Sequence, residues 1–276
     1  MTPALPLVAY PNLEKQVEAM ERDGYVYFPN VLSVDEIAEL CELSERLEPS
    51  AEAYDIDLIP EKDGHFQRCI NAVFNRDPLF LKYLDKTGLI ELAEELHGAD
   101  CHIVSMHTWA VGPGRPDQQL HADWLPAVMP EELHADPRLQ LPLYITTAHF
   151  YLDDMTEELG PTKIVPGSHR SGRGPDKPKT DKNPDTKLGN NWNGVGEQSF
   201  LGKAGDCILF RSEIWHRGTA NVSNQTRHTF MVHYSQRMIT QKFPPYLHFQ
   251  FNPDVLARAT QRQRRLLGEH AQSAYD

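Results

Sequence analysis

A histidine and an aspartate separated by one residue, His121 and Asp123, form the pair in this sequence best suited to bind a metal ion. In an extended strand, residues i and i+2 point to the same face, so both side chains can reach one ion while Ala122 points away. A second histidine from another strand would complete a set of two imidazoles and one carboxylate. Such a set leaves open positions on the metal and is typical of Fe(II) oxygenases, which need those positions for oxygen and an organic co-substrate.

The candidate third ligand is His216. It follows a turn and a predicted strand over 205–210 and lies in the segment Trp215-His216-Arg217-Gly218. Arg227 opens the next apolar run, so on an antiparallel neighbour it can reach a site beside His216. A guanidinium binds a carboxylate in bidentate fashion, so a dicarboxylate could chelate the metal at one end and pair with Arg227 at the other. The alternative is a surface histidine and an arginine in a surface ion pair.

The triplet His-Ala-Asp occurs twice in the chain. The second copy, from His134 to Asp136, is followed directly by Pro137. Because a proline has no N–H to donate to a central strand, this copy is predicted to lie in a surface loop. The first copy follows a Gly-Pro-Gly turn at 112–114 that can lead into a barrel strand. We therefore assign the metal to His121 and Asp123.

Four large aromatic residues lie near the proposed ligands in sequence or on neighbouring predicted strands. They could line a substrate pocket, because pockets are mostly apolar and aromatic, or they could pack in the core. The pocket candidates are Trp109, Trp124, Phe150 and Trp215. Three histidines of the apolar runs are interpreted as core or rim residues with hydrogen-bond partners: His149, His228 and His233. His169, in a Pro-Gly-Ser-His segment, is interpreted as part of a structural turn and not as a ligand.

The chain changes character near residue 100. Residues 1–100 are predicted to be mainly helical, with a capping box at Ser33, and a further helix is expected over 253–270. Strands are predicted over 25–28, 102–111, 141–152, 206–210 and 228–235. Many short strands with turn signals between them, within residues 101–240, indicate a barrel or sandwich. We expect one domain over residues 1–276, mainly β with flanking helices.

Residues 171–198 form a predicted insertion rich in Gly, Pro, Asn, Lys and Asp. A segment this long inside a compact domain is usually functional or disordered. It is interpreted as a lid over the site or, equally, as a solvated insertion.

Composition excludes several classes of function. The formal net charge of −12 argues against nucleic-acid binding, because phosphate contact needs a basic surface. No apolar run reaches the roughly 18 residues of a membrane span, and the N-terminus lacks the features of a signal peptide, so a cytoplasmic location is expected. The cysteines contain no Cys-x-x-Cys pair and are predicted to be free thiols. The expected partner is a small-molecule substrate, with no nucleic acid or membrane, and no oligomeric state is predicted.

Several segments together resemble one known family. They are Asp23-Gly24-Tyr25-Val26, Val31-Leu32-Ser33, Gln118 through Asp123, Glu158-Leu159-Gly160-Pro161-Thr162, Val165-Pro166-Gly167-Ser168-His169, Gly205-Asp206, His216 and Arg227. The sequence that carries them resembles the phytanoyl-CoA dioxygenase (PhyH) family of 2-oxoglutarate oxygenases, and the resemblance covers most of the chain.

The resemblance implies a double-stranded β-helix, which is a jelly-roll barrel of the cupin type. The implied cofactors are Fe(II) and 2-oxoglutarate, with O₂ as co-substrate. The implied metal ligands are His121, Asp123 and His216. The implied contacts of 2-oxoglutarate are Arg227, which would pair with the distal carboxylate, together with Gln118 and Thr162, and a further candidate for the pocket is Asn71.

The expected reaction is hydroxylation of an unactivated C–H bond of a small organic molecule, a natural-product intermediate. The same cofactors could instead support desaturation, cyclisation or endoperoxide formation. Two different classes of protein also stay open at this point. One is a cupin-type metal enzyme that does not use 2-oxoglutarate, which would have no use for Arg227, and the second is a non-catalytic binding module.

Overall fold

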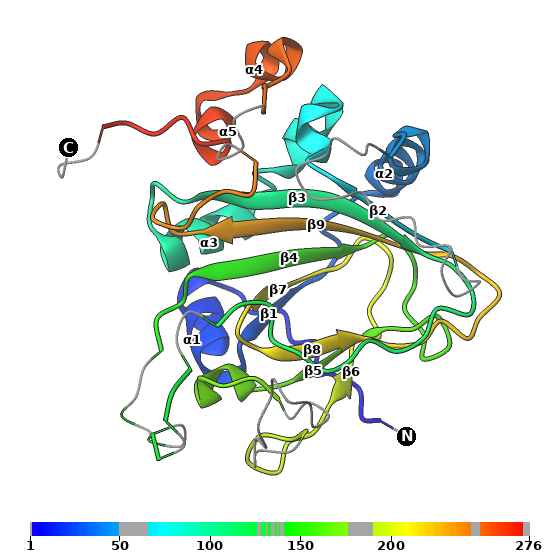
Figure 1. The fold of residues 1–276 in the computed structure, drawn as a ribbon, viewed down its shortest axis with the longest axis vertical. Coiled ribbons are helices and arrows are strands. Elements are labelled where there is room, and N and C mark those ends of the chain that lie inside the picture. The colour runs from blue at the N-terminus through cyan, green and yellow to red at the C-terminus, as the bar shows by residue number, and fades with distance from the viewer. Residues whose placement is uncertain are drawn as a thin grey trace.

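The computed structural model contains two antiparallel sheets that face each other in a jelly-roll arrangement (Figure 1). The residues that it describes are 2–49, 66–125, 128–130, 132–133, 136, 138, 141–175, 190–243 and 249–272. The larger sheet has the strand order β1-β7-β4-β9-β3-β2, and the smaller sheet has the order β6-β5-β8. Within the described residues the two sheets do not join into a closed barrel.

The larger sheet is built from β1 (Tyr25–Phe28), β2 (Gln67–Asn71), β3 (His102–Val111), β4 (Ile145–Tyr151), β7 (Cys207–Arg211) and β9 (Arg227–Ser235). The smaller sheet is built from β5 (Thr162–Val165), β6 (Gln198–Ser199) and β8 (Trp215–Gly218). Each predicted strand has a counterpart, although the one expected over 141–152 is shorter, and β2, β5, β6 and β8 are additional strands outside the predicted ranges. The N-terminal hundred residues thus supply both edge strands of the larger sheet in addition to their helices.

Side chains of the larger sheet alternate between two environments, because successive residues of a strand point to opposite faces. On β9 the outward set is buried in the hydrophobic core: Phe230, Val232 and Tyr234. The inward set lines a cavity between the sheets: Arg227, Thr229, Met231 and His233. Strands β3 and β4 show the same alternation, and the register of β9 with both strands keeps the three patterns in phase.

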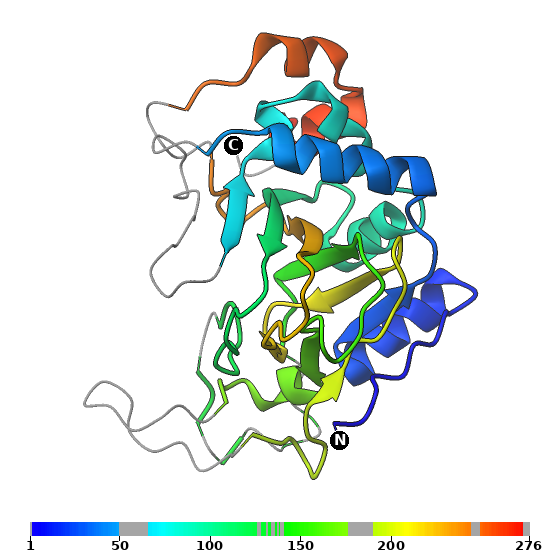
Figure 2. The same ribbon diagram turned by 90° about the vertical axis from the view of Figure 1, so that its right-hand side faces the viewer.

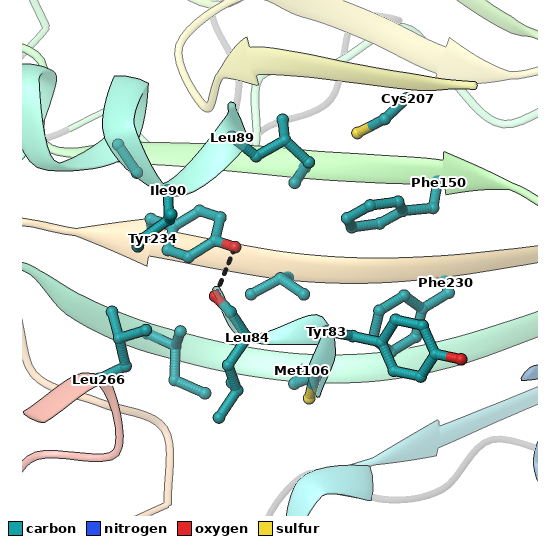
Figure 3. Packing of buried hydrophobic residues seen from close by; sticks show 14 of the residues in the cluster. Tyr83, Leu84, Leu89, Ile90, Met106, Phe150, Cys207, Phe230, Tyr234 and Leu266 are labelled. Atoms are coloured by element: carbon teal, nitrogen blue, oxygen red, sulfur yellow. Dashed lines mark hydrogen bonds between the residues drawn. The ribbon is translucent and has the colours of Figure 1, made fainter. Parts of the chain in front are cut away.

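Helices cover the outward face of the larger sheet (Figures 1 and 2). They are α2 (Val34–Arg46), η1 (Val73–Asn75), η2 (Pro78–Tyr83), α3 (Leu89–His97), α4 (Pro253–Arg258) and α5 (Gln261–Leu266). Figure 3 shows their apolar side chains packed on those of the strands, with the hydroxyl of Tyr234 donating to the Leu84 carbonyl at 2.8 Å. Burial of this face accounts for the main hydrophobic core.

Helix α1 (Leu13–Asp23) contacts η3 (Ser168–Ser171) through the side chain of His169. The helix ends at Gly24, whose φ of 83° is readily adopted by glycine, and a Cβ there would lie 2.4 Å from the Nδ1 of His169. The Nε2 of His169 donates to the Glu21 carbonyl at 3.0 Å. His169 therefore has the structural position that its turn-forming sequence predicts.

One segment prediction differs from the structure, and another falls partly outside the described residues. The helix expected over 253–270 is two short helices, because Ala259 is extended and Thr260 begins a new capping box. Half of the insertion predicted at 171–198 lies outside the described residues, which leave out 176–189, so its role as a lid or as a solvated insertion stays a prediction. Its described end contains the bridge between Trp192 and Val195 and then β6.

Replacing Phe230 with alanine should destabilise the fold by about 3–5 kcal/mol, because the phenyl ring is fully buried among three other aromatic rings. Urea unfolding followed by circular dichroism would measure the change. Met238, which is 75% exposed, provides the control: Met238→Ala should change stability by less than about 0.5 kcal/mol. Equal effects of the two substitutions would contradict the assignment of Phe230 to the core.

Candidate functional site

His121 and His216 are brought together by backbone pairing. The N–H of His121 donates to the His216 carbonyl at 3.0 Å, and the N–H of His216 donates to the His121 carbonyl at 2.8 Å. Three residues earlier, Gln118 N–H donates to the Gly218 carbonyl at 2.9 Å. The segment 118–121 thus lies along β8 as a strand-like extension of the smaller sheet. Leu120, on the opposite face, packs in a small core cluster.

Both imidazoles present Nε2 to Asp123. The Nδ1 of His121 lies 2.7 Å from the Gln119 carbonyl, and that of His216 lies 3.0 Å from the Ile214 carbonyl. A carbonyl only accepts hydrogen bonds, so Nδ1 carries the proton in each ring and Nε2 keeps its lone pair. Each Nε2 is 3.5 Å from an oxygen of Asp123.

These three side chains could hold a metal ion. Their donor atoms all lie within 4.8 Å of one another, and in the described part of the chain this is the one group of histidine, cysteine and carboxylate side chains with that property. Metal bonds to such ligands are about 2.0–2.2 Å long, so small side-chain shifts would bring all three onto one ion. Two imidazoles and one carboxylate form the donor set of a facial triad.

The charges of the triad suit metal binding. Burial lowers the pKa of His216, which keeps its imidazole neutral and able to donate a lone pair, although Asp123 opposes the shift. Burial alone would raise the pKa of the Asp123 carboxyl, but at the acidic pH where it would take up a proton the protonated His216 and His121 rings hold this pKa well below its ordinary value. The aspartate is therefore ionised at neutral pH.

Arg227 faces the same cavity from the first position of β9. Its side chain is 6% exposed, and its Nε and Nη1 atoms are buried without a hydrogen-bond partner among the described residues. Burial lowers the pKa of this guanidinium to about 10, so it remains charged at neutral pH. A buried cation without a partner is costly, and the site therefore has a strong preference for an anionic ligand.

The cavity that joins the triad to Arg227 has a volume of about 350 Å³. Gln118 and Thr162, the other expected co-substrate contacts, also line it. The Oε1 atom of Gln118 accepts from the Gly218 N–H at 2.8 Å, which fixes the amide beside β8. The structure thus brings the six predicted metal and co-substrate residues to one cavity.

The predicted pocket residues divide according to the face on which they lie. Trp109 and Trp124 line the cavity. Phe150 instead points into the main core against Phe230, and Trp215 points away from the neighbouring His216 into the small core cluster. The assignment of Phe150 and Trp215 to the pocket is wrong, because each is one residue out of phase with the inward positions of its strand.

Asn71 is also absent from the residues that line the cavity. It lies at the end of β2, an edge strand, where its register partner is His107 on β3. Paired residues of neighbouring strands share a face, so Asn71 lies on the same side of the sheet as His107 but at its edge, outside the residues that line the cavity.

Sequence reasoning missed several residues of the cavity. His149 and His233 line the cavity, where core or rim positions were expected, and His107 and Arg115 were not considered. The rings of His107 and His233 stack at 5.1 Å, and His233 also contacts the Thr147 hydroxyl at 3.0 Å. The signal was present: on β9, His233 lies six positions after Arg227, an even offset, and therefore shares its face.

The remaining histidine predictions concern the rim and the second triplet. His228 lies beside Asp153, with its Nδ1 3.2 Å from the carboxylate, as expected of a rim residue. Asp136 of the second triplet forms an ion pair with Arg138 at 2.6 Å. His134 and Ala135 lie outside the described residues, so the placement of that histidine stays a prediction.

The jelly roll and its inward His-Asp-His group define a cupin-like protein with a candidate facial metal triad. The model of the family "Phytanoyl-CoA dioxygenase (PhyH)" matches residues 20–229. The chain belongs to this family and is one of its dioxygenases. Among the described residues, no helix is long and apolar enough to cross a membrane.

Individual proteins give the same picture. The chain is 24% identical to L-proline trans-4-hydroxylase of Streptomyces griseoviridis, over 86% of this chain and 91% of the relative. A structure of the epimerase SnoN in complex with Fe3+, alpha ketoglutarate and nogalamycin RO superposes with a TM-score of 0.60 at 19% identity, covering 82% of this chain and 84% of that one. The carbocyclase SnoK gives a TM-score of 0.61 at 20% identity, covering 85% and 88%. At these identities the structural neighbours support the fold.

Replacing His121 with alanine should weaken Fe(II) or Co(II) binding by more than about 100-fold, because loss of a direct ligand should exceed the 10–100-fold effect of losing a supporting residue. Equilibrium dialysis with metal analysis would measure it. His134→Ala is the matched control and should bind metal as the parent does. The reverse result would move the metal to the second triplet.

Proposed function

We propose that this protein is an Fe(II)- and 2-oxoglutarate-dependent dioxygenase that hydroxylates an unactivated C–H bond of a small organic molecule, a natural-product intermediate. The observation that carries the proposal is the buried, unpartnered guanidinium of Arg227 in the same cavity as the His-Asp-His triad. A metal site alone would suit many cupin-type enzymes. The additional arginine is explained if the molecule that chelates the metal carries a second carboxylate at its other end, which the guanidinium can bind.

The residues of the site take complementary roles in this proposal. His121, Asp123 and His216 hold the iron, with both imidazoles fixed in the correct tautomer by backbone carbonyls. Arg227 binds the distal carboxylate of 2-oxoglutarate, and Gln118, already fixed by the Gly218 N–H, contacts the co-substrate. Thr162 lines the cavity and pairs with Gly218 on β8, where its hydroxyl can also reach the co-substrate.

Iron with 2-oxoglutarate and O₂ supplies oxidative decarboxylation, which yields succinate and CO₂ and provides the oxidising power for the C–H bond. The protein contributes ligands, orientation and a sheltered cavity. Trp109 and Trp124 line this cavity and provide apolar surface against which a substrate can pack.

The same residues would serve different oxidative outcomes. Two structural neighbours are described as an epimerase and a carbocyclase, so reactions besides hydroxylation occur on this fold. Desaturation, cyclisation and endoperoxide formation are therefore the alternatives within the proposed class. A cupin-type enzyme that does not use 2-oxoglutarate is disfavoured by Arg227. A cytoplasmic location belongs to the proposal and is supported by four free cysteines.

Adding 2-oxoglutarate to the anaerobic Fe(II)-loaded protein should produce a weak visible charge-transfer band, because the 2-oxo acid would chelate the iron.

Arg227→Ala should leave iron binding intact and raise the KM for 2-oxoglutarate by about 10-fold or more, since a charge-assisted hydrogen bond is lost. Succinate formation in the presence of a turned-over substrate would give the KM. An unchanged KM would show that Arg227 does not bind the co-substrate.

Asp123 should direct the reaction to oxygenation and not to halogenation. A carboxylate in the third ligand position leaves no vacancy there for chloride. Mass spectrometry of products formed in chloride buffer should therefore show oxygen insertion without chlorination, and Asp123→Gly should lose hydroxylation. A chlorinated product from the native protein would refute this assignment.

A further inference from the structure

Arg115 is a second buried guanidinium in the cavity, and it has no role in the site as derived so far. Its side chain is 5% exposed and lines the same cavity as Arg227. Among the described residues its guanidinium donates one hydrogen bond, from Nη1 to the Gly218 carbonyl at 3.4 Å. A surface role is therefore excluded, and the packing alone does not explain a charge at this position.

Asn221 holds Arg115 and Arg227 at the same end of the cavity. The N–H of Asn221 donates to the Arg115 carbonyl at 3.0 Å. The Nδ2 of Asn221 donates to the Val111 carbonyl, also at 3.0 Å, and Val111 is the register partner of Arg227 between β3 and β9. One side chain thus links the loop that carries Arg115 to the ladder that carries Arg227.

The described residues supply no carboxylate to compensate these two cations. Asp117, the acid that acts on Arg115, forms an ion pair with Arg217 at 2.6 Å. Asp153, which acts on Arg227, binds a histidine ring instead. The two guanidiniums also repel each other, since Arg115 acts to lower the pKa of Arg227. Buried cations need a counter-charge, and here it must come from a ligand.

The distance from the metal fits a short dicarboxylate. Gly218 follows His216 by two residues on β8, on the same face and about 7 Å further along the strand. Arg115 reaches this point. If Gly218 carried a Cβ atom, that atom would lie 3.4 Å from the Nη1 of Arg115 and 2.9 Å from the Oε1 of Gln118. The glycine leaves the space open. A five-carbon dicarboxylate that chelates the metal at one end can place its other carboxylate there.

We propose that Arg115 and Arg227 together form a two-guanidinium clamp for the distal carboxylate of 2-oxoglutarate. The inference rests on the proposed function and extends it by assigning Arg115 to co-substrate binding. The clamp draws one arginine from β9 and one from the loop after β3, so it depends on the pairing of these two strands. Planar guanidiniums suit this task because each can donate two parallel hydrogen bonds to a carboxylate.

The test is titration of the anaerobic Fe(II)-loaded protein with 2-oxoglutarate, followed through the charge-transfer band. Arg115→Ala should raise the Kd by about 10-fold or more, and Arg115→Lys, which keeps the charge without the planar fork, should fall between it and the parent. Arg46→Ala is the control, because Arg46 forms a surface ion pair with Asp77 and should leave the Kd unchanged. Pyruvate, which lacks the distal carboxylate, should bind the parent and Arg115→Ala equally.

A melting curve without 2-oxoglutarate separates binding from folding. Because Arg115→Ala removes an uncompensated buried cation, its Tm should equal or exceed that of the parent. A lowered Tm together with an unchanged Kd would show that Arg115 is structural, and an equal loss of pyruvate affinity would show damage to the metal site; either result overturns the clamp. An unchanged Kd with loss of substrate-dependent turnover would also overturn it, by assigning Arg115 to the primary substrate. If the parent protein itself gives no band, the proposed function fails first.

Discussion

The backbone pairing of His121 with His216 is the interaction on which the site depends. It joins two segments almost a hundred residues apart in sequence and sets the imidazole rings 4.5 Å from each other. Because the same segments pair again at Gln118 and Gly218, the register places one face of the extension toward the larger sheet. Two of the three metal ligands, His121 and His216, then follow from one ladder, and a shift of that ladder by one residue would turn one of the two imidazoles away from the cavity.

The sequence predicted features that depend on the spacing of residues within one strand, and it missed some that depend on which face of a strand points to the cavity. His121 and Asp123 share a face whatever surrounds them, so their spacing was informative. Phe150 belongs to a strand in which every residue is buried, so the sequence of β4 does not reveal which side faces the cavity. Trp215 could have been placed from the sequence, because it is adjacent to the predicted ligand His216 on β8 and successive residues of a strand point to opposite faces. Strand β2 has a polar sequence and lies at the edge of the sheet, so its residues show no hydrophobic pattern that would predict a strand. The extended Ala259 that divides the C-terminal helix is an ordinary helix-forming residue, so the sequence did not indicate the break.

Charge is distributed unevenly between the surface and the cavity. The chain carries a formal net charge of −12, yet Asp123 is the one acidic residue among those that line the cavity, whereas Arg115, Arg227 and Lys242 all line it. Composition alone suggested a protein that repels anions. The fold reverses this property locally by placing nearly all of its described acids away from the cavity, and the low-dielectric walls of a cavity strengthen the field of the cations within it. An anionic co-substrate is thereby attracted to the interior of an acidic protein.

The strict alternation on β9 divides the strand into two independent sets of positions. Phe230, Val232 and Tyr234 determine how well the sheet packs on its helices, whereas Thr229, Met231 and His233 form part of the cavity wall. Substitutions in the second set can reshape the cavity without a void or a clash arising in the first. A scaffold with this property separates the requirements of folding from those of recognition, residue by residue along the same strand. Relatives of this chain could therefore acquire new substrates while they keep one core, which fits the variety of reactions found on this fold.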